Sequence, residues 1–166
     1  MRPSSRMLQE DEDYMQSVLK TFGVTKYKLS ETPTRFKLIL TPDRFTMETL
    51  DEVQCLRGAV GIEVDVQKHV FVECLKSGHA RKRRRITANT FKGTIPKAYD
   101  VGKYNPVMRE FLGVEDVCAF DAEVKEGVLE IRNIECLPYA LLKRVADASE
   151  SVEFDMVKHC IRVSMK

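Results

Sequence analysis

The chain has 166 residues, of which 43% are hydrophobic and 31% are charged, and its formal net charge is +2. That length fits one domain, or two small units that share a core, and the composition is ordinary for a soluble globular protein. No apolar run approaches the roughly eighteen residues that a membrane span needs, and the first residues lack the apolar centre of a signal peptide. We therefore expect a protein of the nucleus, or alternatively the cytoplasm, with no membrane contact.

The five cysteines agree with that expectation. Their number is odd and no two of them form a C-x-x-C pair, which argues against a disulfide framework and against a zinc site. Most of them fall at apolar positions, where a free cysteine behaves as a small hydrophobic residue. We expect no metal site and no cofactor.

Residues 1–10 are polar and are predicted to be a flexible tail. The following segment, 11–76, predicts a helix, a hairpin, a second helix and a second hairpin. Its apolar positions recur at helical spacing in the helices and alternate in the first hairpin: Met15, Val18, Leu19, Phe22, Phe36, Leu38, Leu40, Leu50, Val53 and Leu56.

Residues 104–166 predict the same order of elements. Asn105 and Pro106 begin a short helix, and a hairpin then turns at 125–127, where Gly127 suits a tight turn. A further helix and a final hairpin complete the chain. The apolar positions of the two helices are Met108, Phe111, Leu112, Leu141, Leu142, Val145 and Ala148.

Two segments ninety residues apart resemble each other: residues 62–76 read IEVDVQKHVFVECLK and residues 152–166 read VEFDMVKHCIRVSMK. Such a repeat predicts an internal duplication. We therefore predict an α+β fold with mostly antiparallel sheet and pseudo-twofold symmetry. The identical pairs are Glu63/Glu153, Asp65/Asp155, Lys68/Lys158, His69/His159 and Lys76/Lys166. Chance similarity is the alternative, because the apolar phase of the last strand is opposite to that of its copy.

The segment 77–103 has no counterpart in the repeat, and we call it the basic connector. It contains eight lysines and arginines against one acid, Asp100, so its net charge is +7 (8 − 1), and the rest of the chain sums to −5 (2 − 7). A connection of this length in a compact protein is typically functional or disordered. The predicted organisation is thus a tail (1–10), a first repeat (11–76), the basic connector (77–103) and a second repeat (104–166) in one compact unit.

Five consecutive basic residues in the connector have three interpretations: a clamp for nucleic-acid phosphates, a nuclear-import signal, or a solvated linker. Arginine forks bind phosphate oxygens bidentately, and each neutralised phosphate releases counterions. Phe91 and Tyr99 could stack on bases, or they could fasten the connector to the core. The predicted nucleic-acid-binding residues are Arg81, Lys82, Arg83, Arg84, Arg85, Lys92 and Lys97.

Catalytic chemistry is not indicated. Three histidines are scattered along the chain, and His69 and His159 are expected to be corresponding turn residues of the repeat. Phosphate-binding glycine loops, a zinc-protease helix motif and a hydrolase nucleophile elbow are all missing from the sequence. Glu63, Asp65, Glu153 and Asp155 are interpreted as solvated strand positions rather than metal ligands.

The sequence therefore predicts a non-enzymatic nuclear module that binds the phosphate backbone of DNA or RNA through the basic connector. The alternative is a protein–protein adaptor or a structural subunit of a larger assembly, viral or chromosomal. In that case the basic run would serve as an import signal and the acidic hairpins as the contact surface.

Overall fold

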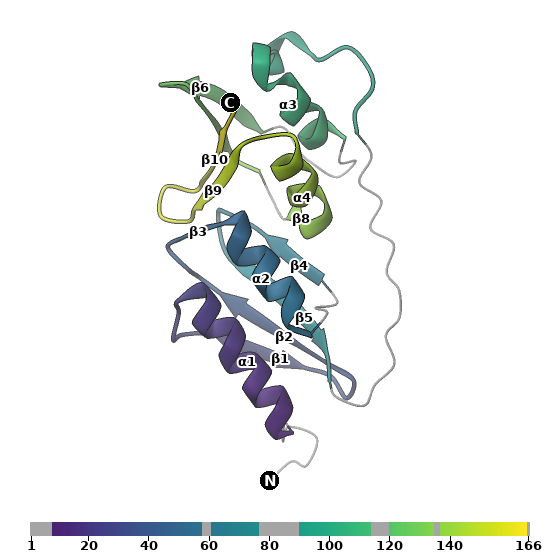
Figure 1. Cartoon of the computed structure of the whole chain (residues 1–166), viewed down its shortest axis with the longest axis vertical. Coiled ribbons are helices and arrows are strands. Elements are labelled where there is room, and N and C mark those ends of the chain that lie inside the picture. The colour runs from purple at the N-terminus through teal and green to yellow at the C-terminus, as the bar shows by residue number, and fades with distance from the viewer. Residues whose placement is uncertain (1–7, 58–60, 77–89, 114–119, 135–136, 166) are drawn as a thin grey trace.

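The computed structural model describes residues 8–57, 61–76, 90–113, 120–134 and 137–165. Residues 81–85, the basic run predicted to bind phosphates, lie outside these ranges. Within them the chain is a mixed α+β protein with four helices and two antiparallel sheets (Figure 1). Among these helices none is long and apolar enough to cross a bilayer.

Sheet A has five strands, and helices α1 (Gln9–Phe22) and α2 (Met47–Arg57) lie over one of its faces (Figure 1). The alternating pattern of β2 (Arg35–Leu40) explains this arrangement, because Phe36, Leu38 and Leu40 are buried toward the helices while the residues between them point away. The Tyr14 ring of α1 packs at 6.1 Å from the Phe36 ring. The order of the strands is β1 (Lys28–Glu31), β2 (Arg35–Leu40), β5 (Val70–Leu75), β4 (Gly61–Val64) and β8 (Leu137–Pro138).

Sheet B also has five strands, and its buried face packs with α3 (Asn105–Leu112) and α4 (Tyr139–Asp147). Its first hairpin turns at Glu126 and Gly127, whose φ angles are 52° and 78°. Two consecutive residues with positive φ match the twist of flanking strands, which is why this turn is so tight. The order of the strands is β3 (Arg44–Thr46), β9 (Ser151–Asp155), β10 (Cys160–Ser164), β7 (Val128–Arg132) and β6 (Asp121–Lys125).

Two short strands exchange between the sheets, and neither was predicted from the sequence. β3 follows β2 of sheet A in the chain but pairs with β9 of sheet B. β8 follows β7 of sheet B but pairs with β4 of sheet A. Each sheet therefore ends in a strand that arrives from the other sheet, and neither sheet is complete without the distant half of the chain.

A single hydrophobic core joins the two sheets. Buried apolar side chains from both sheets and all four helices form one cluster. Within it the Phe45 ring of β3 stacks on the Phe154 ring of β9 with centroids 4.7 Å apart, and the Phe22 ring of α1 meets Phe45 edge-on at 5.4 Å. Such aromatic pairs stabilise the core beyond the burial of apolar area, so Phe45 holds the exchanged strand β3 against both α1 and β9.

Two sequence-based expectations about the helices need adjustment, and one is confirmed. Helix α1 begins at Gln9, two residues before the predicted first repeat (11–76), and Asp11 is buried. Leu56 was assigned to the apolar face of α2, yet 42% of it is exposed. The positions expected in the core of α2, Leu50 and Val53, are fully buried.

The two turns that contain the histidines differ by one residue, which explains the opposite phase of the last strand. In the first copy Val64 pairs with Val70. In the second copy Phe154, ninety residues after Val64, pairs with Ile161, which lies ninety-one residues after Val70. The expectation that His69 and His159 correspond is therefore wrong. The His69 carbonyl closes its turn by accepting a hydrogen bond from the Asp65 N–H at 2.9 Å, whereas His159 lies inside the longer turn with a φ of 57°.

Candidate nucleic-acid interface

The described part of the basic connector, from residue 90 onward, carries two of the predicted binding residues. Lys92 and Lys97 are both exposed. Lys92 lines a shallow hollow of ≈ 480 Å³ together with Arg109 and Asp100, whereas Lys97 lies in a 3-10 turn, Lys97–Tyr99. The structure therefore places these two lysines in solvent without bringing them into one cluster.

Thr90, the first described residue of the connector, is bonded to helices α3 and α4. Its hydroxyl lies 3.1 Å from both carboxylate oxygens of Glu110 in α3. Arg144 of α4 forms an ion pair with the same carboxylate at 2.9 Å and also donates to the Thr90 hydroxyl oxygen. This three-residue contact holds Thr90 against α3 and α4.

The aromatic residues of the connector are also bonded to the rest of the fold. The backbone N–H of Phe91 donates to the Arg109 carbonyl at 3.0 Å, and the Arg109 guanidinium donates back to the carbonyls of Phe91 and Gly93. The Tyr99 hydroxyl donates to the Phe120 carbonyl at 2.8 Å, and the two rings pack with centroids 4.7 Å apart. These contacts favour the fastening role over base stacking for Phe91 and Tyr99.

A group of charged residues, three arginines among them, lies on sheet B, on the face that points away from the helices; we call this the outer face. Cross-strand neighbours share a face in an antiparallel sheet, so the pairing register gives the composition of this surface directly. One row crosses the sheet in the order Arg44, Asp155, Cys160, Arg132 and Asp121. The next row runs Thr46, Glu153, Arg162, Glu130 and Glu123.

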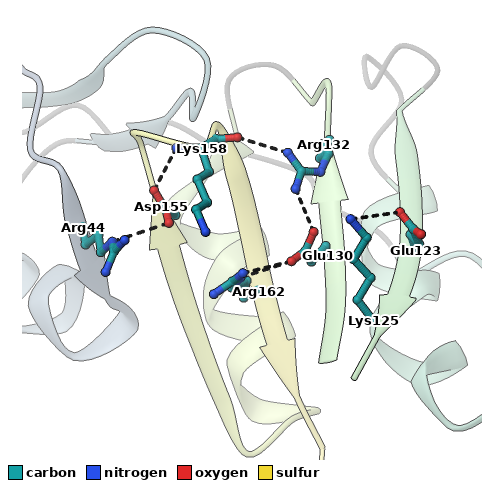
Figure 2. A network of polar contacts seen from close by, with 8 residues as sticks. All are labelled: Arg44, Glu123, Lys125, Glu130, Arg132, Asp155, Lys158 and Arg162. Carbon is teal, nitrogen blue, oxygen red and sulfur yellow. Dashed lines mark hydrogen bonds and ion pairs between the residues drawn. The ribbon is translucent and has the colours of Figure 1, made fainter. Parts of the chain in front are cut away.

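Glu130 organises the centre of these rows (Figure 2). One carboxylate oxygen accepts from Arg132 at 2.8 Å, and the other accepts from Nε and Nη2 of Arg162 at 3.2 and 3.1 Å. The Glu130 side chain is only 6% exposed, whereas those of Arg132 and Arg162 are 38% and 37% exposed. The two guanidinium groups hold the pKa of Glu130 below its ordinary value, the hydrogen bond from Arg132 being the largest cause.

These residues line a hollow of ≈ 470 Å³, which we call the sheet B hollow. Four of its lining residues are cations and two are acids, which gives a net charge of +2 (4 − 2). Arg132 also donates to the carbonyl of Lys158 at 3.2 Å, which holds the turn between β9 and β10 at the rim. The lining residues are Lys125, Glu126, Val128, Glu130, Arg132, Lys158 and Arg162.

Cys160 lies in the same surface row but contributes no charge to it. The side chain is fully buried beside Arg132, and burial raises the pKa of its thiol. The thiol therefore stays protonated near neutral pH, and the positive charge of the neighbouring guanidinium groups is not reduced by a thiolate.

The sheet B hollow is not predicted by the sequence patterns described above. The sequence does contain an indication of this site, because Glu130, Arg132 and Arg162 occupy the polar positions of strands whose other positions are apolar. Polar strand positions are ordinarily solvated, and only the pairing register shows that Arg162 faces Glu130 directly.

The contact made by His159 favours a structural role for this residue over a catalytic one. Its ring Nδ1 lies 2.9 Å from the carbonyl of Val66, so the turn of one sheet contacts the turn of the other. Within the ranges that the structure describes, no group of three or more histidine, cysteine or acidic residues is placed to hold a metal ion.

Comparison with known proteins gives no match: no family model, no curated protein and no solved structure is significantly similar to this chain. The fold itself defines the class, a mixed α+β protein with two antiparallel sheets.

Proposed function

We propose that this protein is a non-enzymatic module that binds the phosphate backbone of DNA or RNA in the nucleus, using the basic connector as its main contact. The observation that carries the proposal is the segregation of charge, with +7 in residues 77–103 and −5 in the remainder. Clustered lysine and arginine bind polyanions without reading sequence, and that affinity falls steeply with salt.

The anchoring of the connector supports this proposal. Thr90, Phe91 and Tyr99 are tied to the core by side-chain and backbone hydrogen bonds, while Lys92 and Lys97 between them remain exposed. A basic segment whose backbone is held against the core loses less conformational freedom on binding than a free tail would. Its cations are therefore available to phosphates at a smaller entropic cost.

We also propose that the scaffold arose by duplication and has pseudo-twofold symmetry. The order of elements from α1 to β5 repeats from α3 to β10, and the strand orders of the two sheets correspond. Asp65 and Asp155 have the same local role, since each carboxylate accepts a hydrogen bond from the backbone N–H two residues later at 3.0 Å. Such Asx turns explain why this residue type is kept in both copies. Superposition of 14–76 on 104–166 in an experimental structure is the test.

Replacement of residues 81–85 by glutamine tests the function. Binding of a short fluorescent DNA duplex should weaken, and the slope of log K against log salt should flatten by roughly four to five units, because each neutralised phosphate contributes about 0.9. The melting temperature should remain within a few degrees of the wild-type value, because removing like charges from a polar segment relieves repulsion. A wild-type protein that binds no nucleic acid at low salt would refute the proposal.

The second candidate function is a protein–protein adaptor whose basic run is only an import signal. A hollow of ≈ 380 Å³ at α2, α4 and β9 favours it, because five of its lining residues are acids and one is a cation, Lys143. A negative surface of this kind fits a basic protein segment. In that case the glutamine variant would stay in the cytoplasm, and no binding to nucleic acid would be seen for either protein. The acids are Glu48, Asp51, Asp147, Glu150 and Glu153.

A further inference from the structure

We propose that the sheet B hollow is a second phosphate-binding site, in which Arg132 and Arg162 bind a phosphodiester group of the same nucleic acid that the connector engages. The identity of the ligand as nucleic acid rests on the proposed function, whereas the site itself does not. The site is defined by the geometry of Glu130 and its two arginines on the outer face of sheet B.

The two guanidinium groups have donors to spare. A guanidinium carries five N–H donors, and the hydrogen bonds in the described part of the chain use two on Arg132 and two on Arg162. Both side chains are more than a third exposed. Each arginine can therefore bind a phosphate oxygen while it remains bonded to Glu130.

Glu130 positions the arginines rather than filling the site. It is almost completely buried, so it lies beneath the two guanidinium groups and not in the solvent-facing layer of the hollow. A long side chain that is already held in one orientation loses less rotational freedom when it binds. The carboxylates of Glu130 and Glu126 cancel two positive charges, but the lining of the hollow remains at +2 because Lys125 and Lys158 add their charges to those of the two arginines.

The placement of the four cations fits an extended polyanion. Arg132 and Arg162 lie diagonally across two neighbouring strands, since Arg162 pairs with Glu130 and Arg132 pairs with Cys160. Lys125 ends the neighbouring strand β6, and Lys158 lies in the turn after β9. Figure 2 shows all four residues on one face of the sheet. A phosphate in the centre would thus meet two forks, with an ammonium group on either side for its neighbours along the backbone.

Inorganic phosphate tests the site without reference to nucleic acid. In the full-length protein, the NMR signals of the Nε–H groups of Arg132 and Arg162 should shift saturably with phosphate and should not shift with chloride at equal ionic strength. Binding by the sheet B hollow is refuted if phosphate leaves both signals in place.

The DNA duplex tests the connection to the proposed function. The double variant Lys125→Gln/Lys158→Gln should flatten the slope of log K against log salt by roughly 1.8 units, since two contacts of about 0.9 each are lost. Both lysines are exposed, so their replacement leaves the fold intact. The matched control is Lys26→Gln/Lys28→Gln, which removes the same charge at exposed positions next to and within β1 of sheet A and should leave the slope unchanged.

A third variant separates geometry from charge. Arg132→Lys/Arg162→Lys keeps both charges but removes the planar forks, so affinity should fall several-fold while the salt slope stays the same. An unchanged affinity would refute bidentate binding.

The two proposals fail in different ways. If phosphate shifts both arginine signals but the wild-type protein does not bind the duplex, the site is correct and the nucleic-acid function is wrong. If the duplex binds and the Lys125/Lys158 variant behaves like its control, the function stands and the second site is refuted.

Discussion

The outer faces of the two sheets differ, although the sheets share a five-stranded antiparallel plan. On sheet A the Lys37 ammonium lies 4.3 Å from the centroid of the Phe71 ring, and Ile39 is half-buried beside it. On sheet B the corresponding surface consists of two rows in which charged side chains predominate, with Glu130 at their centre. The inner faces are constrained by the shared core, so the outer faces are where the two sheets are free to serve different purposes.

The outer faces of the two sheets also differ in the burial of their ion pairs. On sheet A the Arg35–Glu73 ion pair is 3.3 Å long, and its side chains are 26% and 28% exposed. On sheet B the carboxylate of Glu130 is 6% exposed and binds two guanidinium groups. A buried carboxylate with several charge-assisted hydrogen bonds contributes more to the free energy of unfolding than a partly exposed ion pair does. The comparison therefore predicts a larger stabilising contribution from the outer face of sheet B.

The largest effect is expected for Glu130→Ala. Loss of the carboxylate leaves Arg132 and Arg162 without their shared partner and should lower the free energy of unfolding by about 2 kcal/mol, a value reduced by the exposure of both arginines. Glu73→Ala is the matched control on sheet A and should cost about 0.5 kcal/mol. Urea denaturation measures both. Equal losses from the two variants would show that the outer faces do not differ in this respect.

Acid should remove the contribution of Glu130 selectively. Its pKa in the folded protein is lower than the ordinary 4.5, so the folded state binds fewer protons than the unfolded state in the window below that value. Stability from this group is therefore fully present above about pH 5 and is lost as the pH falls through the folded pKa. The stability gap between wild type and Glu130→Gln should close over that window in a series of urea denaturations. A gap that stays constant down to acid pH would contradict the ion-pair explanation.

The buried faces of the strands could be predicted from the sequence, whereas the strand exchange could not. Alternation placed Phe36, Leu38 and Leu40 in the core correctly because six residues are enough to show a period of two. β3 and β8 have three and two residues, which is too short for any period. Their pairing with distant strands depends on the shared core and not on local preference.

The sheet B hollow escaped prediction for a related reason. Whether Arg162 faces Glu130 depends on the register of β10, and that register is set by a turn one residue longer than the turn of its copy. A shift of one residue would turn Arg162 to the inner face. The basic residues of the connector were evident from composition alone, but Lys92 and Lys97 are the only predicted binding residues within the described ranges.

The cation–π contact on sheet A should have a modest effect. Lys37→Gln removes the ammonium group from the Phe71 ring and should lower the free energy of unfolding by about 0.7 kcal/mol. Lys37→Arg retains a cation over the ring and is the matched control, with little loss expected. Thermal denaturation of both variants provides the measurement. If the two variants lose the same stability, the contact contributes nothing beyond side-chain shape.

The smallest effect is expected at the turn between β6 and β7, on the rim of the sheet B hollow. Glu126 has a φ of 52° there, a conformation that asparagine adopts more readily than glutamate, and Asn-Gly is the preferred pair for such a turn. Glu126→Asn should therefore raise the free energy of unfolding by about 0.5 kcal/mol. The matched test of the geometry is Gly127→Ala, which should destabilise the protein because the φ of Gly127 is 78°.

The same Glu126→Asn change also bears on binding. It removes one of the two acids that line the sheet B hollow, so the net charge of the lining rises from +2 to +3 (4 − 1). Phosphate should then bind slightly more tightly, with saturation of the Arg132 and Arg162 signals at a lower concentration, because the attraction of a screened surface charge is small but favourable. The variant should thus gain stability and affinity together. A gain in stability with weaker phosphate binding would mean that Glu126 orders the hollow rather than opposing its ligand.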